Sequence, residues 1–513
     1  MKKEYYIYLL IFIALLPILV FRDFTPSNEL RYLSIADEAL RNGQFFAFTN
    51  HGIPYADKPP LYLWIVMLGK VIFGSHQMWF LSLFSLLPAF GCTIIMNKWV
   101  KEELNPSMQL MATMMLLSCG MFLGTAIVLR MDMLMCLFIL LALHSFYRMT
   151  QDETYLRSRR SLLFSLYMFL ALFTKGPLGI LIPLVSAYVF LAITGRIQKA
   201  GHYTGGWKTW AVLLVGCACW FGLVYIDGGA DYLHNLLFHQ TLDRAVNAFH
   251  HKRAFYYYLY SVWYAMLPWS LLTIGTIIVA ACRKQIVTDL EKLFMTVICC
   301  TFIMLSLISS KLDVYLIPAY PFIIYLGLIY IQRSHFNGWK AAAVGLPAFA
   351  FTVAFPVAYF LMQKPETIFL HQTVFYISAA ILSCTGLTAL YLLFFKHTLR
   401  QSSQIIIIGL FAALFIGGWG IPSINNRIGY ADLCRQALNI AQKRHIKTFC
   451  VWKMYRPENM DVYLNKEVDI LPEEKAVPGT LHNVILLVPA KEAAAIANKK
   501  EQLITGENAI IVL

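Results

Sequence analysis

Two adjacent charged residues near the start of the chain form its clearest candidate for substrate chemistry. Asp57 and Lys58 directly precede Pro59 and Pro60, and an apolar run follows at once. Two successive prolines fix the backbone in an extended turn. A carboxylate can bind a metal ion or a hydroxyl, and a neighbouring ammonium can bind a phosphate. The pattern therefore favours a rigid binding turn at a membrane interface over an ordinary surface ion pair.

A second candidate carboxylate, Glu29, stands at the start of a predicted helix over 29–40. Ser27 or Asn28 can cap this helix, and Gly43 ends it. Its apolar residues form one stripe, so we expect the helix to lie along the membrane surface, with Glu29 near the mouth of the bundle. Glu29 is then either a catalytic group or a side chain that complements the helix dipole.

Three further charged clusters interrupt apolar stretches at their ends. They are Arg130-Met131-Asp132, Lys175-Gly176-Pro177 and Ser310-Lys311-Leu312-Asp313-Val314-Tyr315. A charge at membrane depth is costly and usually faces a cavity or a pathway. Because all three fall on the same side as the two long loops of the chain, we expect them to converge on one face.

The second long loop supplies candidate metal ligands and further cations. It contains His239 and Arg244, followed by His250-His251-Lys252-Arg253. A histidine is a plausible metal ligand, and a guanidinium can hold a phosphate. A loop histidine that is simply solvated is the alternative.

The elements that position these residues are helices that cross a membrane. The chain is 59% hydrophobic and 14% charged, with a mean hydropathy of +0.61, whereas a soluble domain is about half apolar and a quarter charged. Its apolar blocks are about as long as a helix that crosses a ~30 Å hydrocarbon core, and they do not alternate as barrel strands do. We expect an all-α polytopic membrane protein of about thirteen spans, near 5–21, 78–97, 108–128, 131–149, 161–174, 177–195, 207–226, 255–281, 293–310, 315–332, 341–362, 374–396 and 404–421.

The distribution of basic residues predicts the orientation of these spans. The net charge of +14 does not indicate nucleic-acid binding, because Lys and Arg are dispersed at the ends of apolar blocks. Their excess in the short loops places the N-terminus in the cytoplasm and the C-terminus outside. The first apolar stretch, 5–20, lacks a signal-peptidase-like site, so it is predicted to be an uncleaved span.

The chain divides into two predicted parts. Residues 1–424 form a transmembrane domain with long external loops at 22–77 and 227–254. Residues 425–513 are polar and of mixed charge, which predicts a small extracytoplasmic α/β domain. Within it we expect one helix over 431–443 and strands over 448–452, 483–488 and 509–513.

Together these motifs resemble the lipid-dependent glycosyltransferases of the GT-C fold. The likeness is greatest to the branch that contains the aminoarabinose transferase of lipid A and the protein O-mannosyltransferases, and it runs in order through about 5–330. The motifs that carry it are Asn28-Glu29-Leu30-Arg31-Tyr32, Tyr55-Ala56-Asp57-Lys58-Pro59-Pro60, Asp132, Thr174-Lys175-Gly176-Pro177, Leu267-Pro268-Trp269, Ser310-Lys311-Leu312 and Tyr315-Leu316-Ile317-Pro318.

This resemblance implies an inverting transfer at the periplasmic face of a bacterial inner membrane. A sugar would move from a polyprenyl phosphate, such as undecaprenyl phosphate, to a lipid A-like lipid, a glycan or a protein. The resemblance also implies roles for individual residues. The divalent metal ion, zinc being one candidate, would be bound by Asp57 and His239, with His251 as an alternative ligand. The donor phosphate would contact Lys58, Arg244, Tyr315 and Lys311, and Asp132 would be the conserved acid.

One position departs from the family pattern. The family has an aspartate where this chain has Asn28, and an amide cannot act as a base. Either Glu29 or Asp132 would then take the catalytic role. Asp57 replaces a family glutamate, which is a milder change because a shorter carboxylate still binds metal.

A membrane transporter or lipid flippase is the main alternative. Transporters place polar residues near the bilayer midplane, often in broken helices of paired repeats. Here the notable charges lie at span ends and no internal repeat is visible. The pattern therefore favours an enzyme that works at the membrane interface on lipid-linked substrates, without nucleic acid as a partner.

Overall fold

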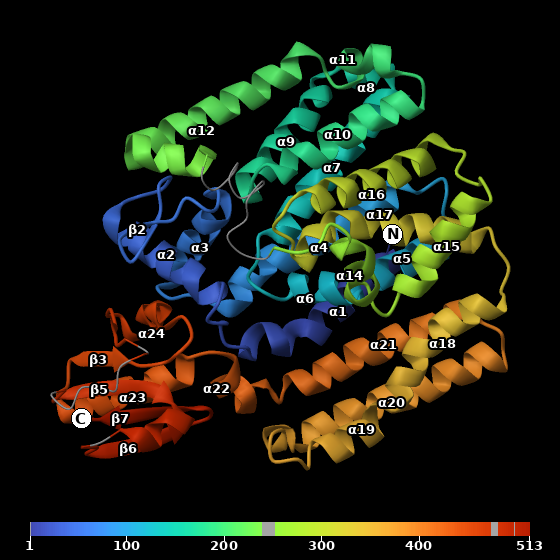
Figure 1. Ribbon diagram of the computed structural model, residues 1–513. Coiled ribbons are helices and arrows are strands. Elements are labelled where there is room, and N and C mark those ends of the chain that lie inside the picture. The colour runs from blue at the N-terminus through green and yellow to red at the C-terminus, as the bar shows by residue number, and fades with distance from the viewer. Residues whose placement is uncertain (1, 239–251, 473, 475–480, 497) are drawn as a thin grey trace.

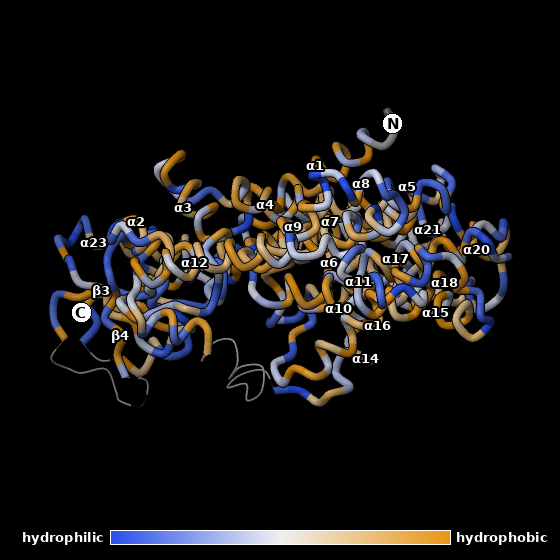
Figure 2. The backbone as a smooth tube through the Cα atoms, turned by 90° about the horizontal axis from the view of Figure 1, so that it is seen from above, coloured by the Kyte–Doolittle hydropathy of each residue, from blue (hydrophilic) through white to orange (hydrophobic). Residues whose placement is uncertain are grey.

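A bundle of apolar helices makes up most of the chain, with a small sheet domain beside it (Figure 1). The computed structural model describes residues 2–238, 252–472, 474, 481–496 and 498–513. Over these residues, eight helices are long and apolar enough to cross a membrane, or nine if one bent pair counts as a single span. The hydrophobic colour in Figure 2 dominates the bundle, while hydrophilic segments gather in the connections and the C-terminal domain.

The bundle is therefore that of a polytopic, mainly helical membrane protein. Its principal helices are α1 (Lys2–Phe21), α4 (Met78–Trp99), α5 (Pro106–Leu117), α6 (Gly120–Ala126), α7 (Asp132–Gln151), α9 (Leu162–Lys175), α10 (Leu178–Ile193), α12 (Trp207–His234), α14 (Tyr257–Ala265), α15 (Ser270–Cys282), α16 (Asp289–Leu307), α17 (Tyr320–Gln332), α18 (Gly338–Thr352), α19 (Ala354–Leu361), α20 (Thr373–Phe394) and α21 (Leu399–Gly418). Every predicted span coincides with one of these helices or with a consecutive pair. The count of thirteen membrane crossings stays a prediction.

Some of the predicted spans are broken in the structure. The span expected over 108–128 is α5 followed by α6, with a bend of 70° between them. At the break the Gly120 N–H donates to the carbonyl of Leu267, 2.7 Å away, instead of continuing the helix. The span expected over 255–281 is likewise divided into α14 and α15. Proline removes a helical donor, so Pro268 suits the second break.

The first external loop folds onto the end of the bundle. It contains α2 (Glu29–Asn42), β1 (Thr49–Asn50), β2 (Ile53–Pro54) and the apolar helix α3 (Leu61–Phe73). Leu30, Leu33 and Ala36 of the predicted stripe are fully buried. Gly43 ends α2 in the left-handed region, at φ 68°, as expected for glycine. Asn28 occupies the N-cap position without a side-chain cap bond, since its Oδ1 accepts from Arg31, 3.0 Å away.

The C-terminal segment forms a five-stranded mixed sheet in the order β4-β3-β5-β7-β6. β3 is parallel to β4 and β5, whereas β7 is antiparallel to β5 and β6. The elements here are α22 (Asn425–Ile428), α23 (Ala431–Arg444), β3 (Thr448–Val451), α24 (Asp461–Leu464), β4 (Asp469–Ile470), β5 (Val484–Pro489), β6 (Glu501–Thr505) and β7 (Asn508–Val512). The helix and three strands expected here are present. The sequence did not predict β4 and β6: β4 is only two residues long, and β6 is mostly exposed.

Buried carboxylates attach this sheet domain to the end of the bundle, beside α2 (Figure 1). Asp23, which follows α1, accepts hydrogen bonds from the hydroxyl of Tyr463 and from the N–H of Ala431. Ser34 of α2 donates to Asp461, 3.0 Å away. Burial raises the pKa of both Asp23 and Asp461. The attachment is therefore polar, specific and sensitive to protonation.

Candidate active site

A cavity of about 450 Å³ lies where five separate segments meet at one end of the bundle. These are the turn before α3, the start of α7, the junction of α9 with α10, the stretch from the middle of α12 to Leu237, and the connection between α16 and α17. Charged side chains and a larger set of apolar ones line the cavity. Its described lining residues are Ala56, Asp57, Lys58, Pro59, Met135, Leu172, Lys175, Gly176, Pro177, Leu178, Leu181, Trp220, Phe221, Leu236, Leu237, Ile308, Ser310 and Tyr315.

The Asp57–Lys58 turn supplies part of the charged lining of this cavity. Lys58 Nζ lies 3.3 Å from Asp57 Oδ2, and both side chains are largely but not fully buried. The hydroxyl of Tyr55 donates to the same carboxylate oxygen over 3.3 Å. The carbonyl of Tyr55 in turn accepts from Tyr232 of α12, 2.8 Å away. Both Asp57 and Lys58 therefore face the cavity from a turn that α12 holds in place.

A largely buried chain of charges supplies the rest of the charged lining. Asp132, at the start of α7, pairs through Oδ2 with Arg130, 3.0 Å away, and through Oδ1 with Lys175. Lys175 Nζ also lies 4.6 Å from the ring centre of Tyr315, within cation–π range. Gly176 ends α9 at φ 116°, a backbone conformation that favours glycine. This turn places Lys175 at the cavity, while the carboxylate of Asp132 stands behind it.

The predicted acid Glu29 lies in a different environment. Its carboxylate accepts two hydrogen bonds from Arg22 (2.6 and 2.7 Å), two from Thr25 (2.7 and 2.8 Å) and one from the N–H of Leu129 (2.8 Å). Burial alone raises the pKa of Glu29, but the Arg22 guanidinium and the N–H donors outweigh burial and lower it. Glu29 does not line the cavity. The geometry indicates that it connects α1, α2 and the segment before α7, instead of facing a substrate.

Lys311 also differs from the expectation. Its ammonium donates to the carbonyl of Ile308, and the residue is 3% exposed. Its neighbours Ile308 and Ser310 line the cavity, but Lys311 does not. The structure thus places Lys311 beside the cavity wall, where it supports the connection between α16 and α17.

Three predicted residues, His239, Arg244 and His251, lie outside the described residues. The described residues close to them in sequence touch the site: Leu237 lines the cavity, and Lys252 forms a β-bridge with Ser310.

The expected metal site can be examined only at Asp57. The described residues contain no group of three His, Cys, Asp or Glu side chains arranged to hold a metal ion. Asp57 supplies a hard oxygen donor at the cavity, as a divalent cation requires, but Lys58 already balances its charge. The metal expected from the resemblance therefore stays a prediction.

Two features of the site were missed at the sequence level. The sequence indicates only that Lys175 is a costly charge at membrane depth. Its pairing with Asp132 depends on the packing of α7 against α9, which the sequence does not show. The apolar lining comes from Trp220, Phe221 and Leu236. No sequence signal distinguishes these side chains from lipid-facing ones, because all three lie in one long, mainly apolar stretch.

The sequence matches known proteins of one kind. Residues 57–221 match the family model described as dolichyl-phosphate-mannose-protein mannosyltransferase. An undecaprenyl phosphate-alpha-4-amino-4-deoxy-L-arabinose arabinosyl transferase of Shewanella sediminis is 27% identical over 373 residues, which are 69% of this chain and 65% of that protein. An uncharacterised Aquifex aeolicus protein is 26% identical over 301 residues, 57% of each chain. The chain thus spans less than two thirds of the length of these relatives.

Solved structures match most or nearly all of the chain. ArnT from Cupriavidus metallidurans, in a crystal structure with bound undecaprenyl phosphate, superposes with a TM-score of 0.75 at 17% identity, covering 99% of this chain and 97% of that one. The arabinosyltransferase EmbB from Mycobacterium smegmatis superposes with a TM-score of 0.51 at 15% identity, over 84% of this chain and 42% of that one. The fold is therefore that of the GT-C class of membrane proteins.

Within this class, the predicted resemblance is confirmed. The chain resembles the aminoarabinose transferases and the protein mannosyltransferases, in sequence and in fold.

Proposed function

We propose that this protein is an inverting glycosyltransferase that uses a polyprenyl-phosphate sugar as donor. One observation carries the proposal: a cavity at the end of membrane-spanning helices is lined by two lysines and by a larger set of apolar side chains. A polyprenyl phosphate has the same two parts, an anionic head and a hydrocarbon chain. Lys58 and Lys175 match the head, and Trp220, Phe221 and Leu236 match the first part of the chain.

The cations stabilise the leaving group. As the bond between the anomeric carbon and the phosphate oxygen breaks, its electron pair stays on the lipid phosphate, where negative charge develops. Ammonium groups already held at that point stabilise this charge without reorganisation. Tyr315 holds Lys175 from one side through its ring.

Asp57 is the carboxylate best placed to act on the acceptor. It lines the cavity, whereas Asp132 does not line it and pairs with Arg130 and Lys175. A hydroxyl acceptor would give its proton to Asp57 as its oxygen bonds to the anomeric carbon from the opposite side, which inverts the configuration. Asp132 is then a positioning residue that holds Lys175. If a divalent cation binds with Asp57 as a ligand, it supplies further positive charge near the phosphate.

The proposed location is the inner membrane of a bacterium, with the site on the periplasmic side. The N-terminus then lies in the cytoplasm, and residues 425–513 form a periplasmic domain appended to the transmembrane domain 1–424. The positive-inside distribution of Lys and Arg supports this orientation. By analogy with the arabinosyl transferases, the donor is an undecaprenyl-phosphate sugar. The acceptor that the sequence resemblance implies is a lipid A-like lipid, with glycan or protein as the other acceptor classes.

Reconstituted transfer tests the proposal. Purified protein in liposomes is given a radiolabelled undecaprenyl-phosphate sugar and lipid A, and labelled product is counted. We expect Lys58→Met and Asp57→Asn to lose transfer, while Lys208→Met, an exposed lysine of α12, keeps it. A wild-type protein that transfers no sugar from a panel of such donors, but moves lipid between leaflets, would establish the flippase instead.

A further inference from the structure

A second polar site lies at the opposite end of the bundle. The span Asp313–Gln332 has Tyr315 of the candidate active site near one end, and Gln332 lines this second site at the other. Its 20 residues correspond to about 30 Å of helix. The two sites therefore face opposite sides of the membrane.

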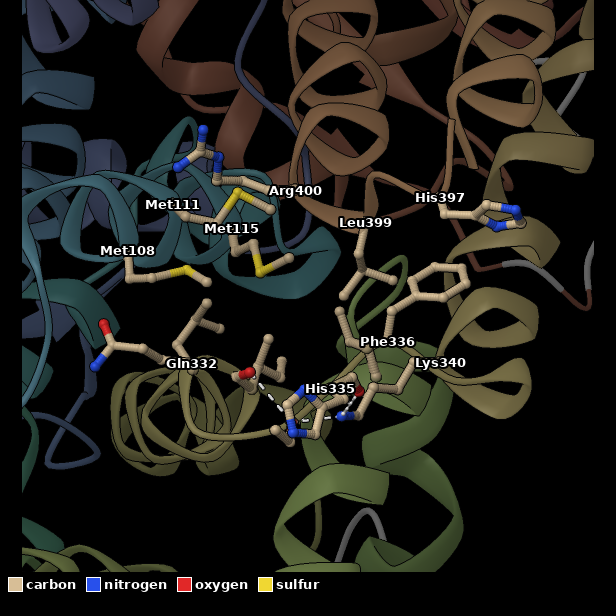
Figure 3. A pocket seen from close by; sticks show the side chains of 14 residues that line it. Met108, Met111, Met115, Gln332, His335, Phe336, Lys340, His397, Leu399 and Arg400 are labelled. Atoms are coloured by element: carbon tan, nitrogen blue, oxygen red, sulfur yellow. Dashed lines mark hydrogen bonds between the residues drawn. The ribbon is translucent and has the colours of Figure 1, made fainter. Parts of the chain in front are cut away.

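Two adjoining cavities form this second site. One has a volume of about 230 Å³ and the other about 630 Å³. Both are lined by Ser334, His335, Phe336 and Lys340, so these residues form their common wall. Figure 3 shows the smaller cavity, with His335 and Lys340 side by side at its edge and three methionines across from them.

The common wall holds a buried cation without an anionic partner. Lys340 is 3% exposed, and its ammonium donates to Ser334 Oγ and to the carbonyl of His335, 2.9 Å away. No carboxylate pairs with it among the described residues. Glu103 and Glu291, which lie at this end of the bundle, are both paired with Arg333. Burying a charge with only neutral partners is costly, so the site as a whole is suited to an anion.

Further positive charge surrounds the same two cavities. Arg283 lines the larger one, and Arg400 lines the smaller one. Arg400 donates to Ser107, 2.9 Å away, which holds its guanidinium at the mouth of the smaller cavity. Cations at a membrane boundary attract anionic lipid headgroups.

The smaller cavity extends from this charged end into the membrane. Met108, Met111 and Met115 lie on one face of α5 and line its length (Figure 3). Met115 lies nine residues after Pro106, the first residue of α5, which is about 14 Å along the helix axis. Methionine side chains are flexible and apolar, and they fit an irregular hydrocarbon chain.

We propose that this is a binding site for an anionic glycerophospholipid of the leaflet opposite the active site. Its phosphate lies in the larger cavity near Lys340 and Arg283, and one acyl chain lies along the methionines of α5. The combination of a buried unpaired cation and an adjoining apolar channel fits a lipid and does not fit a free phosphate ion. The site is separate from the donor cavity, so the proposal does not depend on the proposed glycosyltransferase activity.

Native mass spectrometry of the full-length protein in detergent tests this site directly. The protein is titrated with phosphatidylglycerol and, separately, with phosphatidylcholine, and bound lipid is counted. We expect Lys340→Met to weaken phosphatidylglycerol binding about tenfold or more, because one charged contact is lost. Lys340→Arg keeps the charge and should retain binding, as should Lys208→Met. Met111→Trp fills the channel and should weaken binding without changing the charge.

The outcomes distinguish an anionic-lipid site from nonselective lipid binding and from a site for a free anion. Equal affinity for both lipids, or equal binding by all variants, overturns the proposal. Displacement of phosphatidylglycerol by an equal concentration of inorganic phosphate would also overturn it, since the site would then bind a free anion. If Lys340→Met does not fold, Arg283→Gln and Met111→Trp decide the question, because both positions lie at the cavity walls.

Discussion

The pairing of Asp132 with Lys175 predicts a non-additive loss of activity. Lys175→Met removes one fixed cation from the leaving phosphate, and removal of such a group costs about 10²–10³ in rate, or roughly 3–4 kcal/mol of transition-state stabilisation. Asp132→Asn leaves Lys175 without its carboxylate, and we expect a loss of similar size. If Asp132 acts only through Lys175, the double variant should be no slower than Lys175→Met alone.

The assay is the initial rate of sugar transfer in liposomes, expressed per folded molecule. Thermal unfolding is measured in parallel, because breaking a buried ion pair by removing one partner costs about 3–5 kcal/mol of stability. Asp132→Asn leaves two cations, the buried Lys175 and the partly buried Arg130, without a full counter-charge. The double variant leaves only Arg130, so it should melt above Asp132→Asn.

A multiplicative loss in the double variant, about 10⁴-fold or more, would refute this reasoning. It would mean that Asp132 acts directly on the substrate. That is the role of the conserved acid that the sequence resemblance implies for Asp132. Lys208→Met serves as the control for loss of a lysine.

Three further predictions concern other parts of the chain. Glu29→Gln should lower stability by about 3–5 kcal/mol while the rate per folded molecule changes little, because Glu29 binds Arg22 and not substrate. The pKa of Glu29 is lowered, so its stabilisation is present above the ordinary value of 4.5 and is lost as pH falls through the folded value. The pKa of Asp461 is raised, so the sheet domain should be held most firmly below 3.8 and should loosen as pH rises through the folded value. Limited proteolysis should show this, and Asp461→Asn should reduce the dependence to the part that Asp23 contributes. Phe221→Ala should raise KM about tenfold for a long-chain donor but not for a short-chain analogue.

Each of these has a contrary outcome. A stable but inactive Glu29→Gln protein would show that Glu29 takes part in the reaction. Proteolysis of the sheet domain with the same pH profile in wild type and Asp461→Asn would remove Asp461 as the titrating group. An equal rise in KM for both donors after Phe221→Ala would show that the side chain does not contact the lipid chain.

The sequence predicted the helices well because their main determinant is local. A run of apolar residues long enough to cross the bilayer is a helix wherever it occurs, since every backbone group must be satisfied internally. The break between α5 and α6 escaped prediction because it depends on a hydrogen bond from Gly120 to Leu267, far along the chain. Nothing within 108–128 signals this contact.

Part of the site was also predicted, because short local motifs identify some of its residues. Asp57, Lys58 and Tyr315 are identified by their motifs, and the structure brings them to one cavity. The sequence of α2 does not predict the role of Glu29, because its partners, Arg22 and the N–H of Leu129, lie outside that helix. The partner of an ionisable group decides whether it binds substrate or supports the fold, and that partner is set by tertiary structure.

The contacts of Asp23 have a consequence for the order in which this protein can be completed. Asp23 leaves the ribosome with the first helix, but its partners Ala431 and Tyr463 are made 408 and 440 residues later. Until those residues are made, the Asp23 carboxylate can accept a hydrogen bond from the N–H of Phe24 but not from Ala431 or Tyr463. The helix α1 also packs on α21, which is inserted late. Helix α1 therefore reaches its final environment only after these much later residues have been made. A chain released before residue 431 would leave the Asp23 carboxylate without its bonds to Ala431 and Tyr463.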